Sequence, residues 1–374
     1  MAYKKIGSII NQVNEKNSSG EYSNVLGVSI DKEFMPSVAN IIGTDLKKYY
    51  ILRKNRFAFN PMHVGRDKKL PIALYREDDV ALVSPAYNMF EIIDQEIDKK
   101  YMMLLFKTEK FDHLCWFYTD ANVRGGLSWE DFCNIGFDFP KKEKQMEIVN
   151  KYNFIEKEIN NIENINENIQ SLINTYYKKI FNKNYKTEKA DKIAKITIGK
   201  TPPREESECF SYDKNDVKWV SIADLTKCTT YIFDSNEKLT QDAIDLYNVK
   251  VIPKDTILLS FKMTVGKTAI TTDEMCTNEA IAHFQVNKKE YLFYLYSFLS
   301  NLNYEKLGST SAITSAINSK IIKNIDIPMP DEKELIEYNN KILPLFDTLK
   351  INEMKIKELN QLKKIIVKKI NKGD

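Results

Sequence analysis

The segment PKKEKQMEIVNKYNFIEKEINNIENINENIQSLINTYYKKI, residues 140–180, has a second copy in the chain, PDEKELIEYNNKILPLFDTLKINEMKIKELNQLKKIIVKKI, residues 330–370. The two copies align without a gap at an offset of 330 − 140 = 190 residues, and both close on Lys-Lys-Ile. The match starts ahead of the copies, since Ile135 aligns with Ile325. A repeat at a fixed offset is the signature of a duplicated structural element. The chain is therefore predicted to contain one long element twice.

Each copy predicts a helix of about forty residues, about 60 Å long at 1.5 Å per residue. Apolar residues recur in heptads and form one narrow seam, which needs a helical partner. The nearest partner is the other copy, so we expect the two helices to form an antiparallel coiled coil with an internal pseudo-two-fold. The expected seam residues are Ile155, Ile159, Ile162, Asn166 and Ile169 in the first helix, and Leu345, Leu349, Asn352, Ile356 and Leu359 in the second.

Each seam contains one asparagine, Asn166 in the first helix and Asn352 in the second. A polar residue at such a position is either tolerated polarity or a device that sets the register of the two helices. The sequence leaves both interpretations open.

Two blocks of mixed composition flank the first helix, and short β-branched and aromatic runs with Gly, Pro, Asn and Asp between them predict strand-rich domains with helices. We expect an α/β (α+β) protein with domains at 1–138 and 184–327 and helices at 139–183 and 328–374. The blocks resemble each other faintly: Lys54-Asn55 before FAFNPMHVGRDKKLPIAL corresponds to Lys254-Asp255 before ILLSFKMTVGKTAI, and SPAYNMF (84–90) to NEAIAHF (278–284). Because the helices are similar and the globular blocks differ, the helices suggest a fixed frame, and the two blocks suggest recognition domains with different targets.

Composition excludes several classes of protein. The 374 residues carry 55 Lys+Arg against 52 Asp+Glu, so any nucleic-acid contact must come from local clusters rather than from a global field. The five cysteines are widely spaced and never form C-x-x-C, which argues against a disulfide framework or a zinc site and fits a reducing cytosol. No apolar run reaches the length of a membrane span, so we expect a soluble, cytoplasmic protein.

Two Gly-Lys-Thr triplets, at 199–201 and 266–268, suggest a nucleotide-binding P-loop. That loop needs a glycine five residues before the second one, where this chain has Ala194 and Phe261. The tetrapeptide NPMH at 60–63 likewise imitates an adenine methyltransferase loop but lacks its second proline and its aromatic residue. These gaps disfavour an NTPase or a methyltransferase.

The three histidines offer no metal site, because no pair has the spacing of metal ligands. His113 and His283 each lie in an apolar run, and we interpret both as ordinary side chains with satisfied hydrogen bonds. Pro330-Asp331 with Glu353-Met354-Lys355 imitates a nuclease motif. Along one helix Asp331 and Glu353 would lie about 33 Å apart at 1.5 Å per residue, too far to share a metal.

Several motifs, in this order and together with the repeat, resemble the specificity subunit of type I restriction–modification systems over nearly the full length of the chain. ITIGKTPP followed by VKWVSIADL is similar to the opening motif of the family's target-recognition domains, and GSTSAITSAINSKIIKNIDIPMP to their exit into a conserved helix. FMPSVAN, FAFNPMHVGRD, VSPAYNMF and RGGLSWEDFCNIGFDFP resemble a second variety of the domain. The first block lacks GKTPP, so the two domains are expected to approach DNA with different loops.

The resemblance implies a DNA-reading subunit without chemistry of its own. Each target-recognition domain would read one half of a split, asymmetric site on double-stranded DNA, while the helices set the spacer and dock two methyltransferase subunits. Motor-nuclease subunits would complete the complex. S-adenosylmethionine, ATP and Mg are expected in those partners, and no cofactor in this chain. A rigid spacer also implies that lengthening the helices changes the DNA spacer and leaves the half-site sequences alone.

Candidate DNA contacts cluster in the loop at residues 60–69 and in its counterparts in the second block. Arg and Lys reach phosphates or guanine edges, and Asn can pair with adenine. A charged loop is more often only solvated, but the domain type favours proximity to DNA. The candidates are Asn60, His63, Arg66, Lys68, Lys69 and Arg124 in the first block, and Lys200, Thr201, Arg204, Ser260, Lys262, Lys267 and Thr310 in the second.

Two other functions remain open at this point. One is the specificity subunit of a related system in which methylation and cleavage share one polypeptide. The other is a coiled-coil scaffold or adaptor, which would show no sequence-dependent shift of DNA mobility.

Overall fold

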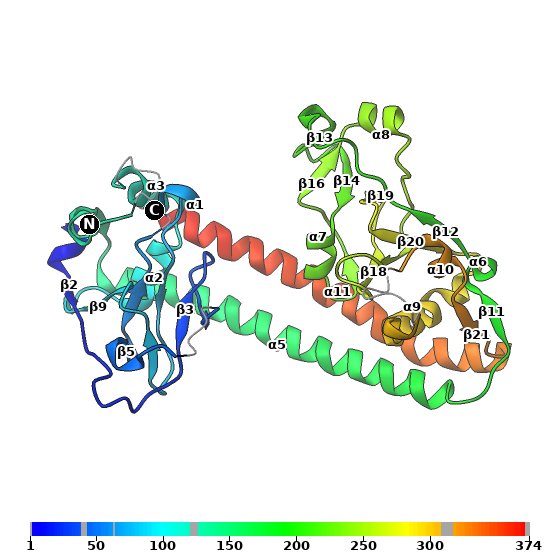
Figure 1. The fold of residues 1–374 in the computed structure, drawn as a ribbon, viewed down its shortest axis with the longest axis horizontal. Helices are drawn as coiled ribbons and strands as arrows, with labels where there is room; N and C mark the ends of the chain where they lie inside the picture. The colour runs from blue at the N-terminus through cyan, green and yellow to red at the C-terminus, as the bar shows by residue number, and fades with distance from the viewer. Residues whose placement is uncertain (1, 39–42, 63, 120–125, 308–316, 371–374) are drawn as a thin grey trace. The chain divides into compact units, whose positions relative to one another are not determined.

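The computed structural model describes residues 2–38, 43–62, 64–119, 126–307 and 317–370 (Figure 1). The chain separates into two compact units: unit 1 comprises residues 1–159 and 358–374, and unit 2 comprises residues 160–357. Both units mix helices and strands. Within the described ranges, no helix combines the length and the apolar character needed to cross a membrane.

The two long helices predicted from the repeat are confirmed. α5 spans Lys142–Ile180 and α11 spans Glu332–Ile370, 39 residues each. Their bounds differ by 332 − 142 = 190 and 370 − 180 = 190 residues, the same offset as the sequence repeat. Acidic residues lie in the first turn of each helix and two lysines in the last turn, which complements the helix dipole.

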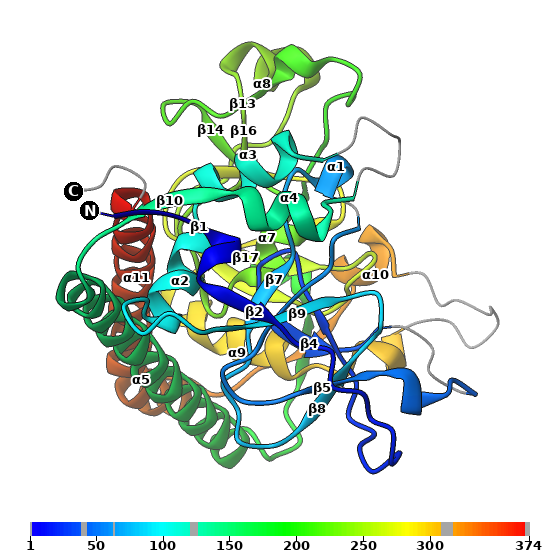
Figure 2. The same ribbon diagram turned by 90° about the vertical axis from the view of Figure 1, so that its left-hand side faces the viewer.

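Unit 1 is built around an antiparallel sheet with the strand order β2-β9-β6-β7, of which β2, β9 and β7 are labelled in Figure 2. Phe57, Phe90 and Phe106 pack in the core between this sheet and helix α2. The elements of unit 1 before α5 are β1 (Ala2–Lys5), η1 (Ile6–Ser8), β2 (Ile10–Gln12), β3 (Leu26–Val28), β4 (Phe34–Pro36), η2 (Leu46–Lys48), β5 (Tyr50–Leu52), β6 (Phe57–Phe59), α1 (Val64–Asp67), β7 (Ile72–Leu74), β8 (Ala81–Val83), β9 (Asn88–Ile92), α2 (Lys99–Phe106), α3 (Glu109–Phe117), α4 (Trp129–Asn134) and β10 (Gly136–Phe139).

Unit 2 has a larger sheet, β12-β20-β17-β18-β15, and a smaller one, β13-β16-β14-β19. Its core joins the larger sheet to α9 and to the part of α11 that belongs to this unit. Its elements before α11 are β11 (Thr187–Lys189), α6 (Ala190–Ile193), β12 (Ala194–Ile198), η3 (Ser207–Cys209), β13 (Phe210–Ser211), β14 (Val217–Val220), α7 (Ile222–Lys227), β15 (Tyr231–Ile232), β16 (Glu237–Leu239), α8 (Gln241–Tyr247), β17 (Ile257–Ser260), β18 (Thr268–Thr271), β19 (Met275–Thr277), β20 (Ile281–Val286), η4 (Lys289–Tyr291), α9 (Leu292–Asn301), η5 (Tyr304–Leu307), α10 (Ser319–Lys323) and β21 (Asp326–Pro328).

The two units share one sheet topology. The antiparallel order β2-β9-β6-β7 of unit 1 recurs as β12-β20-β17-β18 in unit 2. Phe57 pairs with Phe90 as Ile257 pairs with Phe284. This match confirms the faint alignment between the blocks, which placed Phe90 opposite Phe284. The small sheet of unit 2 is an addition to the shared plan.

Each unit also closes its ends in the same way. β1 pairs with β10 in unit 1, and β11 pairs with β21 in unit 2. Next to these pairs the Ile6 N–H donates to the Ile135 carbonyl (2.8 Å), and the Ala190 N–H donates to the Ile325 carbonyl (2.9 Å). Ile135 and Ile325 are the residues at which the repeat starts, so the repeat extends into the strand that leads to each long helix.

The two long helices contact each other within each unit. In unit 2 the Asn352 Nδ2 donates to the Asn166 Oδ1 at 2.7 Å, so the two seam asparagines bond to each other. In unit 1 Lys363 donates to Glu156 at 3.1 Å and lies 4.9 Å from the centre of the Tyr152 ring. The contact residue on α5 changes from Glu156 to the later Asn166, while its partner on α11 changes from Lys363 to the earlier Asn352.

All ten expected seam residues are covered in their own units. Ile159, Ile162, Asn166 and Leu349 are buried, and the other six are half-buried. The sequence interpretation overlooked Pro344, which lies exposed inside α11 and removes one helical N–H. It also overlooked the burial of Glu353.

His283 is buried on β20 with both ring nitrogens paired. Nδ1 lies 2.9 Å from the Thr197 hydroxyl and Nε2 lies 2.7 Å from the Thr277 hydroxyl, which confirms the interpretation as a satisfied side chain. Burial lowers the pKa of His283 to about 4. His113 instead lies exposed on α3.

Unit 2 is predicted to lose stability in mild acid through His283. In the unfolded state the histidine has a pKa near 6.5, whereas in the folded state it is protonated only near pH 4. The free energy of unfolding therefore decreases as the pH falls from 6.5 toward 4, because the unfolded state binds the extra proton. At pH 5 the loss is about 2 kcal/mol, at about 1.4 kcal/mol for each pH unit. Urea unfolding at pH 7 and pH 5 measures it. His283→Gln should reduce the difference between the two pH values, while His113→Gln should leave it unchanged; equal differences in both variants contradict the assignment.

Candidate nucleic-acid interface

The candidate loop of unit 1 connects β6 to β7. Asn60 begins it, and its side-chain oxygen accepts from the Met62 N–H at 3.0 Å while its own N–H donates to the Pro71 carbonyl. The short helix α1 follows, and Lys68 with a φ of 53° turns the chain toward β7. Asn60 is half-buried, and its side-chain oxygen stabilises the loop itself through the bond to Met62.

Three cations project from the end of this loop. Arg66 is exposed and pairs with its neighbour Asp67 at 2.7 Å, which partly neutralises it. The Lys68 ammonium lies 4.8 Å from the centre of the Trp116 ring, and Lys69 is exposed. The remaining candidates of the first block, His63 and Arg124, lie outside the described residues.

An aromatic surface beside this loop was missed by the sequence interpretation. Trp116 and Phe117 end α3 and Tyr118 caps it, and 44%, 78% and 37% of their surfaces are exposed. The signal was the run itself, because three consecutive residues point in different directions around a helix and cannot share one buried face. The Leu127 N–H donates to the Pro61 carbonyl at 3.1 Å, so the segment after residue 125 also returns to the loop.

A buried ion pair fixes the far end of the same loop. The Asp112 carboxylate on α3 accepts from the Lys32 ammonium at 2.6 Å and from the Leu70 N–H at 3.1 Å. The side chains of Lys32 and Asp112 are only 5% and 10% exposed. Burial lowers the pKa of Lys32, and the charge of Asp112 opposes that shift. Asp112 therefore joins the β3–β4 turn, α3 and the end of the basic loop.

In unit 2 the corresponding loop connects β17 to β18. The Ser260 hydroxyl accepts from the Lys267 N–H at 3.0 Å and donates to the Thr264 carbonyl. Ser260 is fully buried, so its hydroxyl holds the hairpin together instead of facing DNA, contrary to the prediction of a direct contact. Lys262 is exposed and Lys267 half-buried. Thr310 lies outside the described residues.

The GKTPP motif joins the two sheets of unit 2. The Gly199 N–H donates to the Ile281 carbonyl (3.1 Å), and the Lys200 carbonyl accepts from the Trp219 Nε1 (3.2 Å). The Lys200 ammonium donates to the Tyr247 carbonyl at 2.6 Å, which satisfies an acceptor at the end of α8. The Thr201 hydroxyl donates to the Glu279 carboxylate, and this bond holds the pKa of Glu279 below its ordinary value. Both predicted phosphate-binding side chains thus bond to other groups of the protein at its surface.

Arg204 is held by two aromatic rings and by an ion pair. Its guanidinium lies 4.2 Å from the centre of the Phe210 ring and 4.7 Å from that of Trp219. Its Nη1 donates to both oxygens of Glu237 at 3.0 Å. Half of the side chain is exposed, so stacking and the ion pair present a preorganised edge to solvent.

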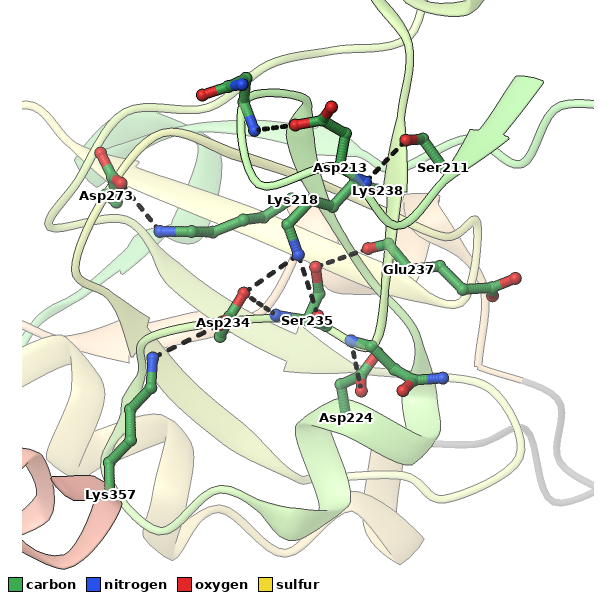
Figure 3. Close-up of polar contacts among 12 residues, drawn as sticks. Ser211, Asp213, Lys218, Asp224, Asp234, Ser235, Glu237, Lys238, Asp273 and Lys357 are labelled. Atoms are coloured by element: carbon green, nitrogen blue, oxygen red, sulfur yellow. Dashed lines mark hydrogen bonds and ion pairs between the residues drawn. The ribbon is translucent and has the colours of Figure 1, made fainter. Parts of the chain in front are cut away.

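The segment that carries Glu237 is held by a polar network that Figure 3 shows. The buried Lys238 donates to Asp234 at 3.3 Å, and Lys357 of α11 donates to the same carboxylate at 3.4 Å. Asp224 caps α7 through Ser221 and also accepts from a backbone N–H of the segment. Burial by itself raises the pKa of Asp234, but the Ser235 N–H and the two ammonium groups lower it overall.

Glu353 has a structural role that the sequence did not reveal. Its carboxylate, on α11, accepts from the Thr230 N–H at 3.0 Å, the Tyr231 N–H at 2.9 Å and the Thr229 hydroxyl. Burial raises the pKa of Glu353. The residue that imitated a nuclease carboxylate ties the larger sheet to the helix.

Comparison with known proteins gives the second half of the chain a family match. Residues 182–364 match the family model described as the type I restriction modification DNA specificity domain. A segment of 181 residues is 26% identical to the type I restriction enzyme MjaIX specificity subunit of Methanocaldococcus jannaschii, covering 47% of this chain and 41% of that protein. The HindI specificity subunit of Haemophilus influenzae is 22% identical over 186 residues, covering 49% and 40%. The chain thus matches less than half of the length of these relatives.

A solved structure shares the fold over a longer range. The type I restriction–modification S subunit from M. genitalium superposes with a TM-score of 0.57 over 99% of this chain and 95% of its own. The sequences are 13% identical, so this likeness concerns the fold.

Proposed function

We propose that the chain is the DNA specificity subunit of a type I restriction–modification complex. The starting point is the match of residues 182–364 to the family model of type I restriction modification DNA specificity domains. Each unit reads one half of a bipartite, asymmetric site on double-stranded DNA. The observation that carries this proposal is the sheet order that both units share, decorated with different loops. A common scaffold with different loops suits two half-sites of different sequence.

The loops between β6 and β7 and between β17 and β18 are the proposed reading elements. In unit 1, Lys68 lies beside the exposed Trp116 ring, and Lys69 is exposed next to it in the chain. In unit 2, Lys262 and Arg204 present cations. Phosphate contacts from these side chains position the protein, and base contacts from the loops specify the sequence. We keep Lys200 and Thr201 as supports of the surface, because their side chains bond internally.

We further propose that α5 and α11 form an antiparallel coiled coil that sets the spacer and docks the methyltransferase subunits. The Asn166–Asn352 bond supports the view that these residues set the register, since a buried asparagine loses its partner in any shifted pairing. We place methyl transfer, with S-adenosylmethionine, and ATP- and Mg-dependent cleavage in partner subunits. The chain itself then acts without catalysis.

Inserting one heptad into both helices should change the DNA spacer and leave the half-sites unchanged. Seven residues add about 10 Å at 1.5 Å per residue. That length corresponds to about three base pairs, at about 10 base pairs for each 34 Å turn. The motif methylated by the reconstituted complex measures the change. A changed half-site with an unchanged spacer contradicts the role of the helices.

The main test is single-molecule mapping of methylated adenines. The chain is combined with its methyltransferase partner, and total DNA is methylated and sequenced. We expect a split motif that disappears when the chain is omitted. Methylation of an unsplit motif, or methylation that persists without the chain, overturns the proposal.

Electrophoretic mobility separates the scaffold alternative. A specificity subunit with its partner shifts DNA that carries the motif at lower protein concentration than DNA without it. A scaffold shifts both equally or neither. Fused methyltransferase and nuclease activities in one partner polypeptide would favour the related system instead.

A further inference from the structure

We propose that Met263, at the tip of the loop between β17 and β18, makes an apolar contact with a base step of the half-site that unit 2 reads, and that Met62 is its counterpart in unit 1. This inference rests on the proposed function and names residues that determine its specificity.

The two methionines occupy matching places. Phe59 of β6 and Leu259 of β17 hold equivalent positions in the shared register, and Met62 lies three residues and Met263 four residues farther on. Each methionine begins a Met-x-Val-Gly tetrapeptide, at 62–65 and 263–266. Both strands hold the same place in the shared sheet order. The loops differ in length and in other residues, so this common tetrapeptide stands out against a divergent background.

Met263 is held out into solvent by a strained backbone. Its side chain is 89% exposed, and its φ is +61°, in the left-handed region that unbranched and branched side chains alike rarely adopt. Met62 is 42% exposed. An exposed apolar side chain in such a conformation contributes little to the stability of the fold. We therefore infer that Met263 contacts a binding partner.

The loop around Met263 is preorganised from below. Besides the Ser260 hydroxyl, the Gly266 N–H donates to the Ser260 carbonyl at 2.9 Å. Gly266 has a φ of +87° and presses against the Tyr304 ring, which a Cβ at Gly266 would approach to 2.8 Å. The Tyr304 hydroxyl donates to the Leu299 carbonyl, at the end of α9. A rigid base beneath an exposed tip reduces the entropy lost on binding.

The charges around the tip favour DNA as the partner. Lys262 precedes Met263 and is exposed, and Lys267 ends the loop. The nearby carboxylate of Glu279 already accepts the hydroxyl of Thr201. This arrangement of cations on both sides of an apolar side chain matches a groove of DNA, where phosphates lie on both sides of the base edges. There a methionine can pack against a thymine methyl group or enter a base step, and its flexible thioether adapts to the surface.

Met263→Gly gives a test with two opposite readouts. Glycine adopts a positive φ without strain, so the urea midpoint of unit 2 should rise. Loss of the apolar contact should reduce discrimination at one base pair of the unit 2 half-site by about tenfold, within the usual effect of one altered position. The discrimination is measured as methylation, by the reconstituted complex, of a DNA library with both half-sites randomised. Met263→Leu keeps the apolar volume and should retain most of the discrimination.

Met62→Gly is the matched control, because it should relax the other half-site and leave that of unit 2 unchanged. The inference is overturned if Met263→Gly keeps every base preference within about twofold, or weakens all sequences equally. A wild-type complex that methylates no split motif defeats the proposed function instead. A higher midpoint together with relaxed specificity cannot come from misfolding, which lowers the midpoint.

Discussion

Replacing Asp112 with alanine is expected to destabilise unit 1 by about 3–5 kcal/mol, the usual cost of leaving one charge of a buried pair without its partner. Lys32, in the β3–β4 turn, would keep the Phe106 carbonyl as an acceptor but would lose the carboxylate that balances its charge. The Leu70 N–H would lose its acceptor at the same time. Hydrogen exchange of the unit 1 amides measures the loss, and unit 2 serves as the internal reference.

The pH dependence of this variant provides a second signature. Burial already lowers the pKa of Lys32, and removing Asp112 lowers it further. A cation whose folded pKa is depressed costs stability while the pH lies below its unfolded pKa, so the deficit should shrink as the pH rises toward about 10. A deficit that does not change with pH points to lost packing rather than to the stranded charge.

The double variant Lys32→Met with Asp112→Leu is the matched control. Two apolar residues of similar volume remove both charges together, and such replacements are often neutral. The Leu70 N–H then lacks its acceptor and the Phe106 carbonyl lacks its Lys32 donor, and each unsatisfied group costs about 1–3 kcal/mol. If the single Asp112→Ala variant loses less than about 1 kcal/mol, the pair is weaker than its burial indicates.

The second large effect is expected at Gly199. A Cβ there would lie 2.1 Å from the Thr277 hydroxyl and 2.2 Å from the Asn278 carbonyl, so Gly199→Ala must separate β12 from the turn between β19 and β20. Overpacking usually costs about 1–3 kcal/mol, and clashes with backbone atoms place this variant at or above the upper limit. Denaturant unfolding measures the loss in unit 2.

Gly27→Ala is the matched glycine control, because its Cβ would meet only the Tyr87 hydroxyl at an ordinary 3.5 Å. It should change stability by less than about 1 kcal/mol. A Gly199→Ala variant that keeps its stability but loses DNA binding would contradict the structural role of Gly199. That result would instead support phosphate binding by the Gly-Lys-Thr triplet at 199–201.

The long helices were predictable because periodicity and repetition are properties of the sequence itself. The bounds of α5 and α11 reproduce the 190-residue offset. The shared sheet was partly predictable, since Phe90 and Phe284 aligned before their register was known. The small sheet of unit 2 was not, because its strands of two to four residues carry too little pattern.

The candidate site was less predictable, because one side chain serves several purposes with the same chemistry. A lysine ammonium donates to a phosphate or to a backbone carbonyl, and Lys200 does the latter. A serine hydroxyl likewise either meets DNA or closes a hairpin, as Ser260 does. Asp112 and Lys32 are 80 residues apart, and Glu353 and Thr230 are 123 apart. No local pattern announces such pairs.

The order of the units along the chain has a consequence for synthesis. Unit 1 begins with residues 1–159 and is completed only by residues 358–374, so the ribosome makes all of unit 2, 357 − 160 + 1 = 198 residues, in between. At about 5–20 residues per second this takes about 10–40 s. Throughout that interval the apolar side chains of Val149 and Tyr152 lack part of their packing. The missing partners in the complete core are Ile366, Val367 and Ile370. The nascent chain therefore carries an open apolar surface for tens of seconds, until residues 366–370 cover it.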